Sequence, residues 1–303
     1  MKRLAVLIIM AVFGSLFTAA PAQAVGGGVI SVKCKFSHTN FDDPIVFPGV
    51  VGAAHHHGFV GAKTTNANST YDSMIASGTS CPVDVDTAGY WFPLIVNPNG
   101  SVVKPVQVNI YYRSPSGASV SAFPADLRII AGGDTKNPPQ PSLVQRSLSY
   151  SCKDSGPFFD HPINCGTRAT IAHVHFPNCL ANGAIDSPDH RSHMKYGGKN
   201  CGTGYTAVPK VSFHIRYKGV VDGAGLTSDV GGSAPGQTLH ADFWNTWDQD
   251  ALEFLVDTCL NGGKDCKGMT NAKLANLGFV AGTTTGTGGA SEPTEPTPEP
   301  CGV

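Results

Sequence analysis

Glutamate is nearly missing from the body of this 303-residue chain, and charge of either sign is scarce, at 14% of residues. Three of the four glutamates lie in the last dozen residues, which leaves Glu253 alone in the body. A glycosidase that works through a pair of glutamates is therefore excluded. The net charge of −1 gives no electrostatic attraction to nucleic acid, which we do not expect as a partner.

Motifs that mark several enzyme classes are also missing. The sequence has no G-x-S-x-G nucleophile elbow, no phosphate-binding G-x-x-x-x-G-K-[ST] loop and no Cys-x-x-Cys pair. These absences argue against a serine hydrolase, a P-loop nucleotidase and a thiolate zinc site.

The start of the chain has the composition of an export signal. Lys2 and Arg3 precede an apolar stretch at residues 4–17, and a small-x-small cleavage site follows at residues 22–24. This order is typical of a signal peptide, so we expect a secreted protein, extracellular or attached to the cell wall. The apolar stretch is shorter than the ~20 residues that span a membrane, and no span is expected later.

The rest of the chain divides by composition. The last residues are rich in Gly, Thr, Pro and Glu, which cannot bury enough apolar surface to order themselves. We therefore expect four segments: a signal peptide at 1–24, a flexible segment at 25–33, a single β-rich domain at 34–280 and a disordered tail at 281–303.

Eight cysteines in an exported body predict up to four disulfides. Eight cysteines allow 105 connectivities, so spacing alone decides nothing. Proximity in the sequence favours the pairs Cys152–Cys165, Cys179–Cys201, Cys259–Cys266 and Cys34–Cys81. The odd cysteine, Cys301, either pairs with another chain or is a free thiol.

Apolar periodicity predicts a mainly β fold. The run from Tyr90 to Val96 and the run from Ser101 to Tyr112 flank Asn97-Pro98-Asn99-Gly100, which is a strong hairpin signal. Further strands are expected at 127–131, 170–176 and 211–217, a helix at 247–260 and a short helix at 271–277. We expect one all-β domain, a β-sandwich of the jelly-roll kind, with long disulfide-pinned loops and one or two C-terminal helices.

Histidine is the chemically informative residue, with eleven in the chain. His55-x-His57 and His173-x-His175 each place two imidazoles on one side of an extended segment. His240-x-Asp242 does the same with a carboxylate, and Asp189, His190 and His193 share a polar loop. A single surface histidine is usually just solvated, whereas four such groups in one body indicate a shared polar site.

Two chemistries fit these groups. Imidazoles and an aspartate hold a divalent metal such as zinc or copper, and we assign His55 and His57 as the metal ligands. Alternatively, histidine and aspartate perform general acid–base catalysis, with His240, Asp242, His190 and His193 as the catalytic residues. For substrate binding we select Tyr90, Trp91, Asp189 and Trp244, although aromatic residues in such strands are commonly core.

An ordered series of motifs resembles the DUF1996 family, a domain of unknown function. The series opens with Asp43-Pro44-Ile45-Val46, Pro48-Gly49 and His55-x-His57-x-Phe59-x-Gly61. It continues through Ala88-Gly89-Tyr90-Trp91-Phe92-Pro93 to the segment from Asp186 to Met194, and it closes at His240-Ala241-Asp242-Phe243. One departure is that Cys179 is followed by Leu180-Ala181-Asn182-Gly183, where the family usually reads Cys-Trp-Asp-Gly.

The resemblance implies secretion, since the family occurs in secreted fungal and bacterial proteins, in fungi sometimes beside WSC-type sugar-binding domains. It implies no reaction. From the residues and the resemblance together, we expect a hydrolase or lyase acting on extracellular polysaccharide through a His/Asp site. The competing hypotheses are a non-catalytic metal-binding or carbohydrate-binding surface protein, and a structural wall protein whose histidines only bond loops. Sequence does not give the oligomeric state.

Overall fold

The computed structural model describes residues 27–281, apart from 116, 134–146, 230 and 232. The predicted signal peptide, most of the predicted tail and Cys301 lie outside the described residues. No helix among the described residues is long and apolar enough to cross a membrane.

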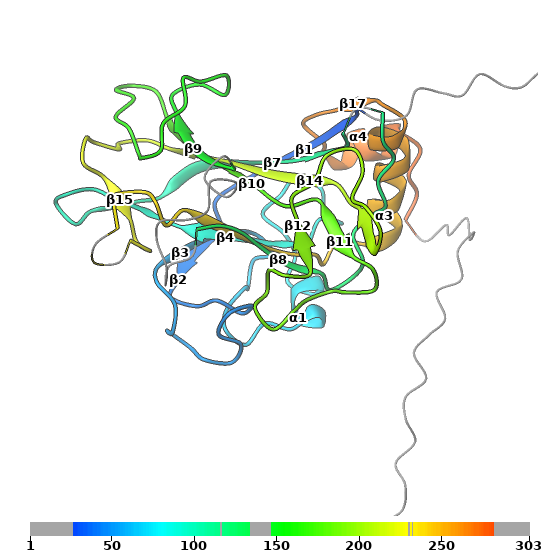
Figure 1. The fold of residues 1–303 in the computed structure, drawn as a ribbon, viewed down its shortest axis with the longest axis horizontal. Coiled ribbons are helices and arrows are strands. Elements are labelled where there is room, and N and C mark those ends of the chain that lie inside the picture. The colour runs from blue at the N-terminus through cyan, green and yellow to red at the C-terminus, as the bar shows by residue number, and fades with distance from the viewer. Residues whose placement is uncertain (1–26, 116, 134–146, 230, 232, 282–303) are drawn as a thin grey trace, which may run out of the picture.

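Two antiparallel-rich sheets form the body of the protein, one above the other in Figure 1. The six-stranded sheet has the order β17 (Asp265–Cys266), β1 (Val29–Cys34), β7 (Pro105–Arg113), β14 (Lys210–Tyr217), β10 (Thr170–His175) and β9 (Leu148–Ser151). The five-stranded sheet has the order β2 (His38–Asn40), β3 (His57–Gly61), β4 (Gly89–Pro93), β16 (His240–Trp244) and β8 (Arg128–Gly132). This sandwich confirms the predicted all-β class.

Two small sheets and four helical segments accompany the large sheets within the described residues. One small sheet joins β12 (Met194–Lys195), β11 (Cys179–Ala181) and β13 (Tyr205–Ala207), and the other joins β15 (Gly225–Leu226), β5 (Ile95–Val96) and β6 (Val102–Val103). The helices are α1 (Tyr71–Ile75), α3 (Gln249–Leu255), the π-helical η1 (Val256–Asn261) and α4 (Asn271–Asn276). The predicted helices at 247–260 and 271–277 are thus confirmed, whereas α1 was not predicted.

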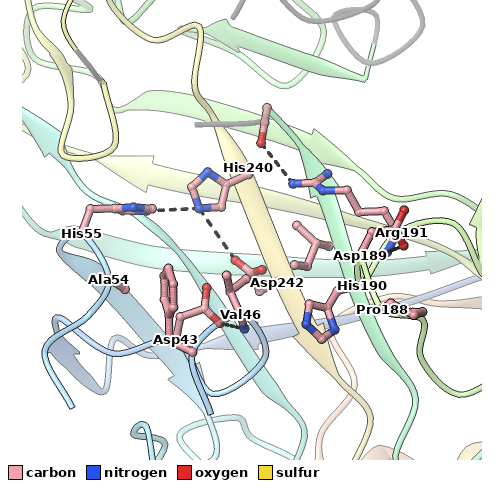
Figure 2. A pocket seen from close by; sticks show the side chains of 13 residues that line it. Asp43, Val46, Ala54, His55, Pro188, Asp189, His190, Arg191, His240 and Asp242 are labelled. Atoms are coloured by element: carbon pink, nitrogen blue, oxygen red, sulfur yellow. Dashed lines mark hydrogen bonds and ion pairs between the residues drawn. The ribbon is translucent and has the colours of Figure 1, made fainter. Parts of the chain in front are cut away.

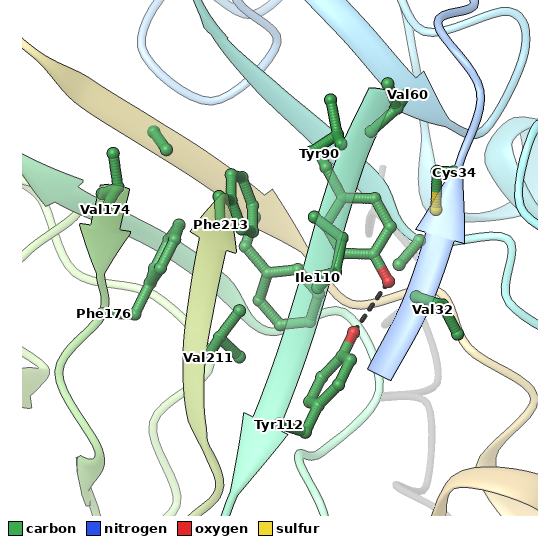
Figure 3. Packing of buried hydrophobic residues seen from close by; sticks show 14 of the residues in the cluster. Val32, Cys34, Val60, Tyr90, Ile110, Tyr112, Val174, Phe176, Val211 and Phe213 are labelled. Atoms are coloured by element: carbon green, nitrogen blue, oxygen red, sulfur yellow. Dashed lines mark hydrogen bonds between the residues drawn. The ribbon is translucent and has the colours of Figure 1, made fainter. Parts of the chain in front are cut away.

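The core lies between the two large sheets. Along β4 and β7, alternate side chains point inward and meet face to face, as Figure 3 shows for Tyr90 and Tyr112. The two hydroxyl groups form a hydrogen bond of 2.7 Å. Nε1 of Trp247 donates a hydrogen bond of 3.0 Å to the hydroxyl oxygen of Tyr112. Tyr90 also donates to Asp86 at 2.7 Å, so the polar atoms of these buried rings are satisfied.

The predicted long hairpin is correct only at its tip. β5 and β6 pair around the Asn97–Gly100 turn, but β4 and β7 belong to different sheets. Pro93 ends β4 and Pro105 begins β7, and proline has no N–H to continue a ladder. The apolar faces of the two arms therefore pack across the core instead of pairing side by side.

One boundary and the disulfide pairing can also be compared with the sequence analysis. Residues 29–33, expected to be flexible, belong to β1, because Ile30 and Val32 point into the core. All four disulfides follow the predicted pairing: Cys34–Cys81, Cys152–Cys165, Cys179–Cys201 and Cys259–Cys266.

Candidate metal centre

The outer face of the five-stranded sheet carries the main histidine group. On β16, Ala241 and Phe243 enter the core, so the period of two turns His240 and Asp242 to the opposite side. His57 projects to the same side from β3, since Gly58 and Val60 alternate with it. The loops at residues 41–56 and 186–193 cover this face, because both contribute side chains to the pocket above it.

Three imidazoles converge there through their Nε2 atoms. Nε2 of His240 lies 3.2 Å from Nε2 of His55 and 3.3 Å from Nε2 of His57. Figure 2 shows His55 and His240 pointing toward one another across the pocket. In the sequence, His240 is 185 residues from His55 and 183 residues from His57. The pairing of distant strands in the sheet therefore brings these rings together.

The other ring nitrogens fix the tautomers of two of these histidines. Nδ1 of His57 contacts the carbonyl oxygen of Asp42 at 3.0 Å, and Nδ1 of His240 contacts that of Thr238 at 2.8 Å. A carbonyl only accepts, so each Nδ1 carries the hydrogen and each neutral ring presents a bare Nε2. His55 can donate one hydrogen to His240, but the contact between His57 and His240 still joins two acceptors.

Burial keeps the three rings neutral. It lowers the pKa of His55 to about 4, and it places the pKa values of His57 and His240 well below their usual range. The neighbouring imidazoles add to the effect on His57 and His240, because a second positive charge beside the first is unfavourable. At neutral pH, protons therefore do not separate these lone pairs.

A buried carboxylate borders the same point. Oδ2 of Asp242 lies 3.9 Å from Nε2 of His240, and neither carboxylate oxygen has a hydrogen-bond partner among the described residues. Burial, and then the nearby Asp43, raise the pKa of Asp242 well above its usual value. Burial also raises the pKa of Asp43, although the backbone amides of Ile45 and Val46 each donate to it at 3.0 Å.

These side chains form a donor set for a transition metal. The ligand atoms of His55, His57 and His240 lie within 4.8 Å of one another, and so do those of Asp43, His57 and Asp242. Imidazole with carboxylate suits zinc, copper and iron, and ligating histidines usually donate their second nitrogen to a carbonyl, as two do here. A third close group, Cys34, Cys81 and Asp86, offers no thiolate because its cysteines form a disulfide.

A pocket of about 510 Å³ opens beside this donor set. His55, His240 and Asp242 form one wall, and His190 and Arg191 contribute to the other, as Figure 2 shows. Nδ1 of His190 lies 2.9 Å from the carboxylate of Asp186. The backbone of His190 has a φ of 55°, a left-handed conformation that is costly for a non-glycine residue and is concentrated at functional sites.

Two residues of this loop that were predicted as site residues, Asp189 and His193, stabilise the conformation of the loop. Asp189 lines the pocket edge but accepts hydrogen bonds from Ser187 and from the backbone amides of Arg191 and Ser192, which hold its pKa far below the usual range. His193 does not line the pocket. Its Nδ1 contacts Ser187 Oγ at 2.8 Å and its Nε2 contacts the carbonyl of Arg128 at 2.7 Å, so it fastens the loop to β8. These contacts give His193 a structural role, and its catalytic role stays a prediction.

The predicted aromatic platform is wrong. Tyr90 and Trp91 are completely buried, and Trp244 is 2% exposed, so none offers a ring face to a ligand. Strand β4 lies inside the sheet with a loop layer over its outer face, and alternation therefore does not bring Trp91 to the surface. Trp244 donates to Asp126 at 2.7 Å and lies under the guanidinium of Arg128.

Sequence reasoning missed three side chains of the pocket region: Asp43, Asp186 and Arg191. All three lie within segments that carried the family resemblance, and this was the available signal. Arg191 is anchored by the carbonyls of Gly132 and Gly133, at 3.3 and 3.2 Å, which fixes it at the pocket wall.

Fold and site together define an all-β sandwich protein with a buried three-histidine pocket on the outer face of one sheet. The model of the family described as "Domain of unknown function (DUF1996)" matches residues 43–247, more than half of the chain, and the protein belongs to that family. Neither the comparison with curated proteins nor the comparison with solved structures found a match.

Proposed function

We propose that this protein is a secreted metal-dependent enzyme, a hydrolase or lyase of extracellular polysaccharide, with a divalent zinc or copper ion held by His55, His57 and His240. One observation carries the proposal: two bare Nε2 atoms face each other at 3.3 Å beside a buried carboxylate that has no described hydrogen-bond partner. Such an arrangement is costly without a cation between the groups.

A metal at this point would act as a Lewis acid on an oxygen of the substrate. The pocket above it falls within the usual 300–1,000 Å³ range of ligand sites, and its wall is rich in polar groups. His55 is its most accessible ligand, because His57 and Asp242 are completely buried. Substrate would therefore approach from the side of His55 and His190.

His190 supplies the proton-transfer group in this proposal. Its Nδ1 faces Asp186, which orients the ring and leaves Nε2 for the pocket. A histidine oriented by a carboxylate is a common general acid or base near neutral pH. The roles predicted for His240 and Asp242 as an oriented base change accordingly, since Nε2 of His240 faces two imidazoles and Asp242 lies with the metal ligands.

A second candidate function is metal binding without catalysis. Its supporting observation is the number of ligands: His55, His57, His240 and Asp242 supply four, and four protein ligands close a structural zinc site. In that case no coordination position remains for substrate, and His190 has no chemical role.

The two candidates are separated by metal content and product formation in the full chain. Protein reconstituted with zinc or copper is dialysed, its metal measured, and its products on a polysaccharide panel compared with those of His240→Ala and His190→Ala. The proposal expects about one ion per chain, lost in His240→Ala, and retained in His190→Ala while product formation falls about 100-fold or more.

The contrary results are equally specific. Wild-type protein that holds its ion but yields the same absence of product as His190→Ala on every polysaccharide supports the non-catalytic candidate. Wild-type protein that retains no ion under these conditions rejects both.

A further inference from the structure

The outer face of the other, six-stranded sheet carries a like-charged pair in direct register. Arg113 on β7 lies opposite Lys210 on β14, and both project away from the core because Tyr112 and Val211 beside them point into it. Directly opposed residues of neighbouring strands have Cβ atoms about 5 Å apart, where like charges destabilise the sheet. Both side chains are half-buried, which strengthens their repulsion.

No described acid neutralises this pair. Neither Arg113 nor Lys210 has an ion pair or a side-chain hydrogen bond within the described part of the chain, and Arg113 instead lies 4.3 Å above the ring of Tyr111. The acid in the same row of the sheet, Asp265, is two strands from Arg113 and is bonded to Lys267 at 2.6 Å. Burial, and then Arg113, lower the pKa of Lys210.

The positive charge continues along the same face. Lys33 lies on β1 opposite Asn109, and it lines a groove of about 600 Å³ together with Lys35 and Lys63. The described lining of that groove contains no acid, and none of its lysines has an ion pair among the described residues. Asp154 lies over the same outer face, but it is already bonded to His214 and Arg216, four and six residues along β14 from Lys210.

Uncharged polar groups lie beside these cations, where they can form hydrogen bonds with a sugar. The side chains of Tyr111 and His175 are partly exposed beside the pair, although the ring of Tyr111 packs against Arg113 at 4.3 Å and against the ring of His214 at 4.6 Å. Phenol hydroxyl and imidazole groups form hydrogen bonds with the hydroxyls of a pyranose. The whole chain has a net charge of −1, so this local excess of cations is a property of one face and not of the protein.

We propose that the outer face of the six-stranded sheet binds an acidic polysaccharide, whose carboxylates lie between Arg113 and Lys210 and along the path toward Lys33. The site is independent of the metal pocket, which lies on the outer face of the other sheet. An anion there neutralises the opposed cations, and a chain of uronate sugars supplies one in each unit.

Affinity electrophoresis of the full chain in gels containing polygalacturonate tests this proposal. We expect the wild-type protein to be retarded, and retardation to weaken as salt is added because exposed charges are screened. The Arg113→Gln/Lys210→Gln variant, which keeps side-chain length, should bind at least about tenfold more weakly. The matched control, Lys104→Gln/Lys218→Gln, removes the same charge from the opposite end of strands β7 and β14 and should bind as the wild type does.

Three outcomes overturn the proposal: no retardation of the wild type, equal retardation of the Arg113/Lys210 variant, or an equal loss in the control variant. Retardation by single-stranded DNA as strong as by polygalacturonate also overturns it, since that identifies a non-specific polyanion surface. His57→Gln, which alters the metal pocket, should leave retardation unchanged, so failure of the proposed enzyme activity does not affect this result.

Discussion

A group of three histidines lies at the outer face of each large sheet, and the two groups differ in what their nitrogens face. In the group on the five-stranded sheet, the Nε2 atoms of His55, His57 and His240 point at one another. In the group on the six-stranded sheet, His173 contacts Ser151 Oγ at 2.7 Å and His175 contacts Ser212 Oγ at 2.7 Å. The third member, His214, contacts Asp154 at 3.0 Å.

The comparison shows that close imidazoles alone do not make a metal site. The ring centroids of His173 and His214 are 4.4 Å apart, nearly as close as those of His55 and His57 at 4.1 Å. Their nitrogens, however, have hydroxyl or carboxylate partners, and among the described residues their ligand atoms form no converging set. What distinguishes the first group is that the Nε2 lone pairs of His57 and His240 meet without a hydrogen to share.

The largest expected difference between the groups is in metal content. His240→Ala should reduce bound zinc or copper at least about tenfold, because it removes the nitrogen that faces both other ligands. His214→Ala, the matched change on the other sheet, should leave metal content unchanged. Elemental analysis after dialysis measures both, and equal losses in the two variants would show that the groups do not differ as described.

The next effect concerns the buried carboxylate. In metal-free protein, Asp242→Asn should raise the free energy of unfolding by about 1–3 kcal/mol, because burial disfavours the ionised form that this carboxyl takes in the unfolded chain at neutral pH. In the presence of metal, the same change should weaken ion binding about 10–100-fold. Urea unfolding with and without zinc gives both numbers. Destabilisation in the metal-free state would mean that Asp242 has a partner we have not identified.

The pH dependence of stability sharpens the account of the second group. Burial lowers the pKa of His173 to about 3 and that of His175 to about 4, from 6.5 in a free chain. Between these values the unfolded chain binds more protons than the folded one, so stability falls as the pH drops from 6.5 toward 4. The slope is up to ~1.4 kcal/mol per pH unit for each histidine. Urea titrations at pH 7 and pH 5 should show a smaller decline in His173→Gln.

The smallest effect is expected at the ion pair that borders the second group. Asp154 is half-exposed and pairs with Arg216 at 2.6 Å, so Asp154→Asn should cost less than about 1 kcal/mol. Thermal unfolding at low and high salt measures it. A larger loss would show that the bond from His214 to Asp154 holds the 152–165 loop in place.

Local patterns predicted several strands and the C-terminal helices, whereas they could not show which strand faces are covered by loops. The alternation in Val211–Tyr217 identified β14, and short spacing identified three of the disulfides and, by elimination, the fourth. The same alternation failed at Trp91, whose outward face is covered by a distant loop. His240-x-Asp242 and His55-x-His57 were recognised as pairs, but their meeting depends on the order β3-β4-β16, which no local pattern encodes.

The covalent links and the proposed ion differ greatly in the length of chain that they enclose. The four disulfides join cysteines 7 to 47 residues apart, whereas the contacts of His240 join positions 183 and 185 residues apart. The chain entropy removed by a link increases with the logarithm of the loop that it closes. A bound ion would therefore be the longest-range staple in the protein, tying its first quarter to its last quarter, and it would keep doing so in a reducing medium where the disulfides open.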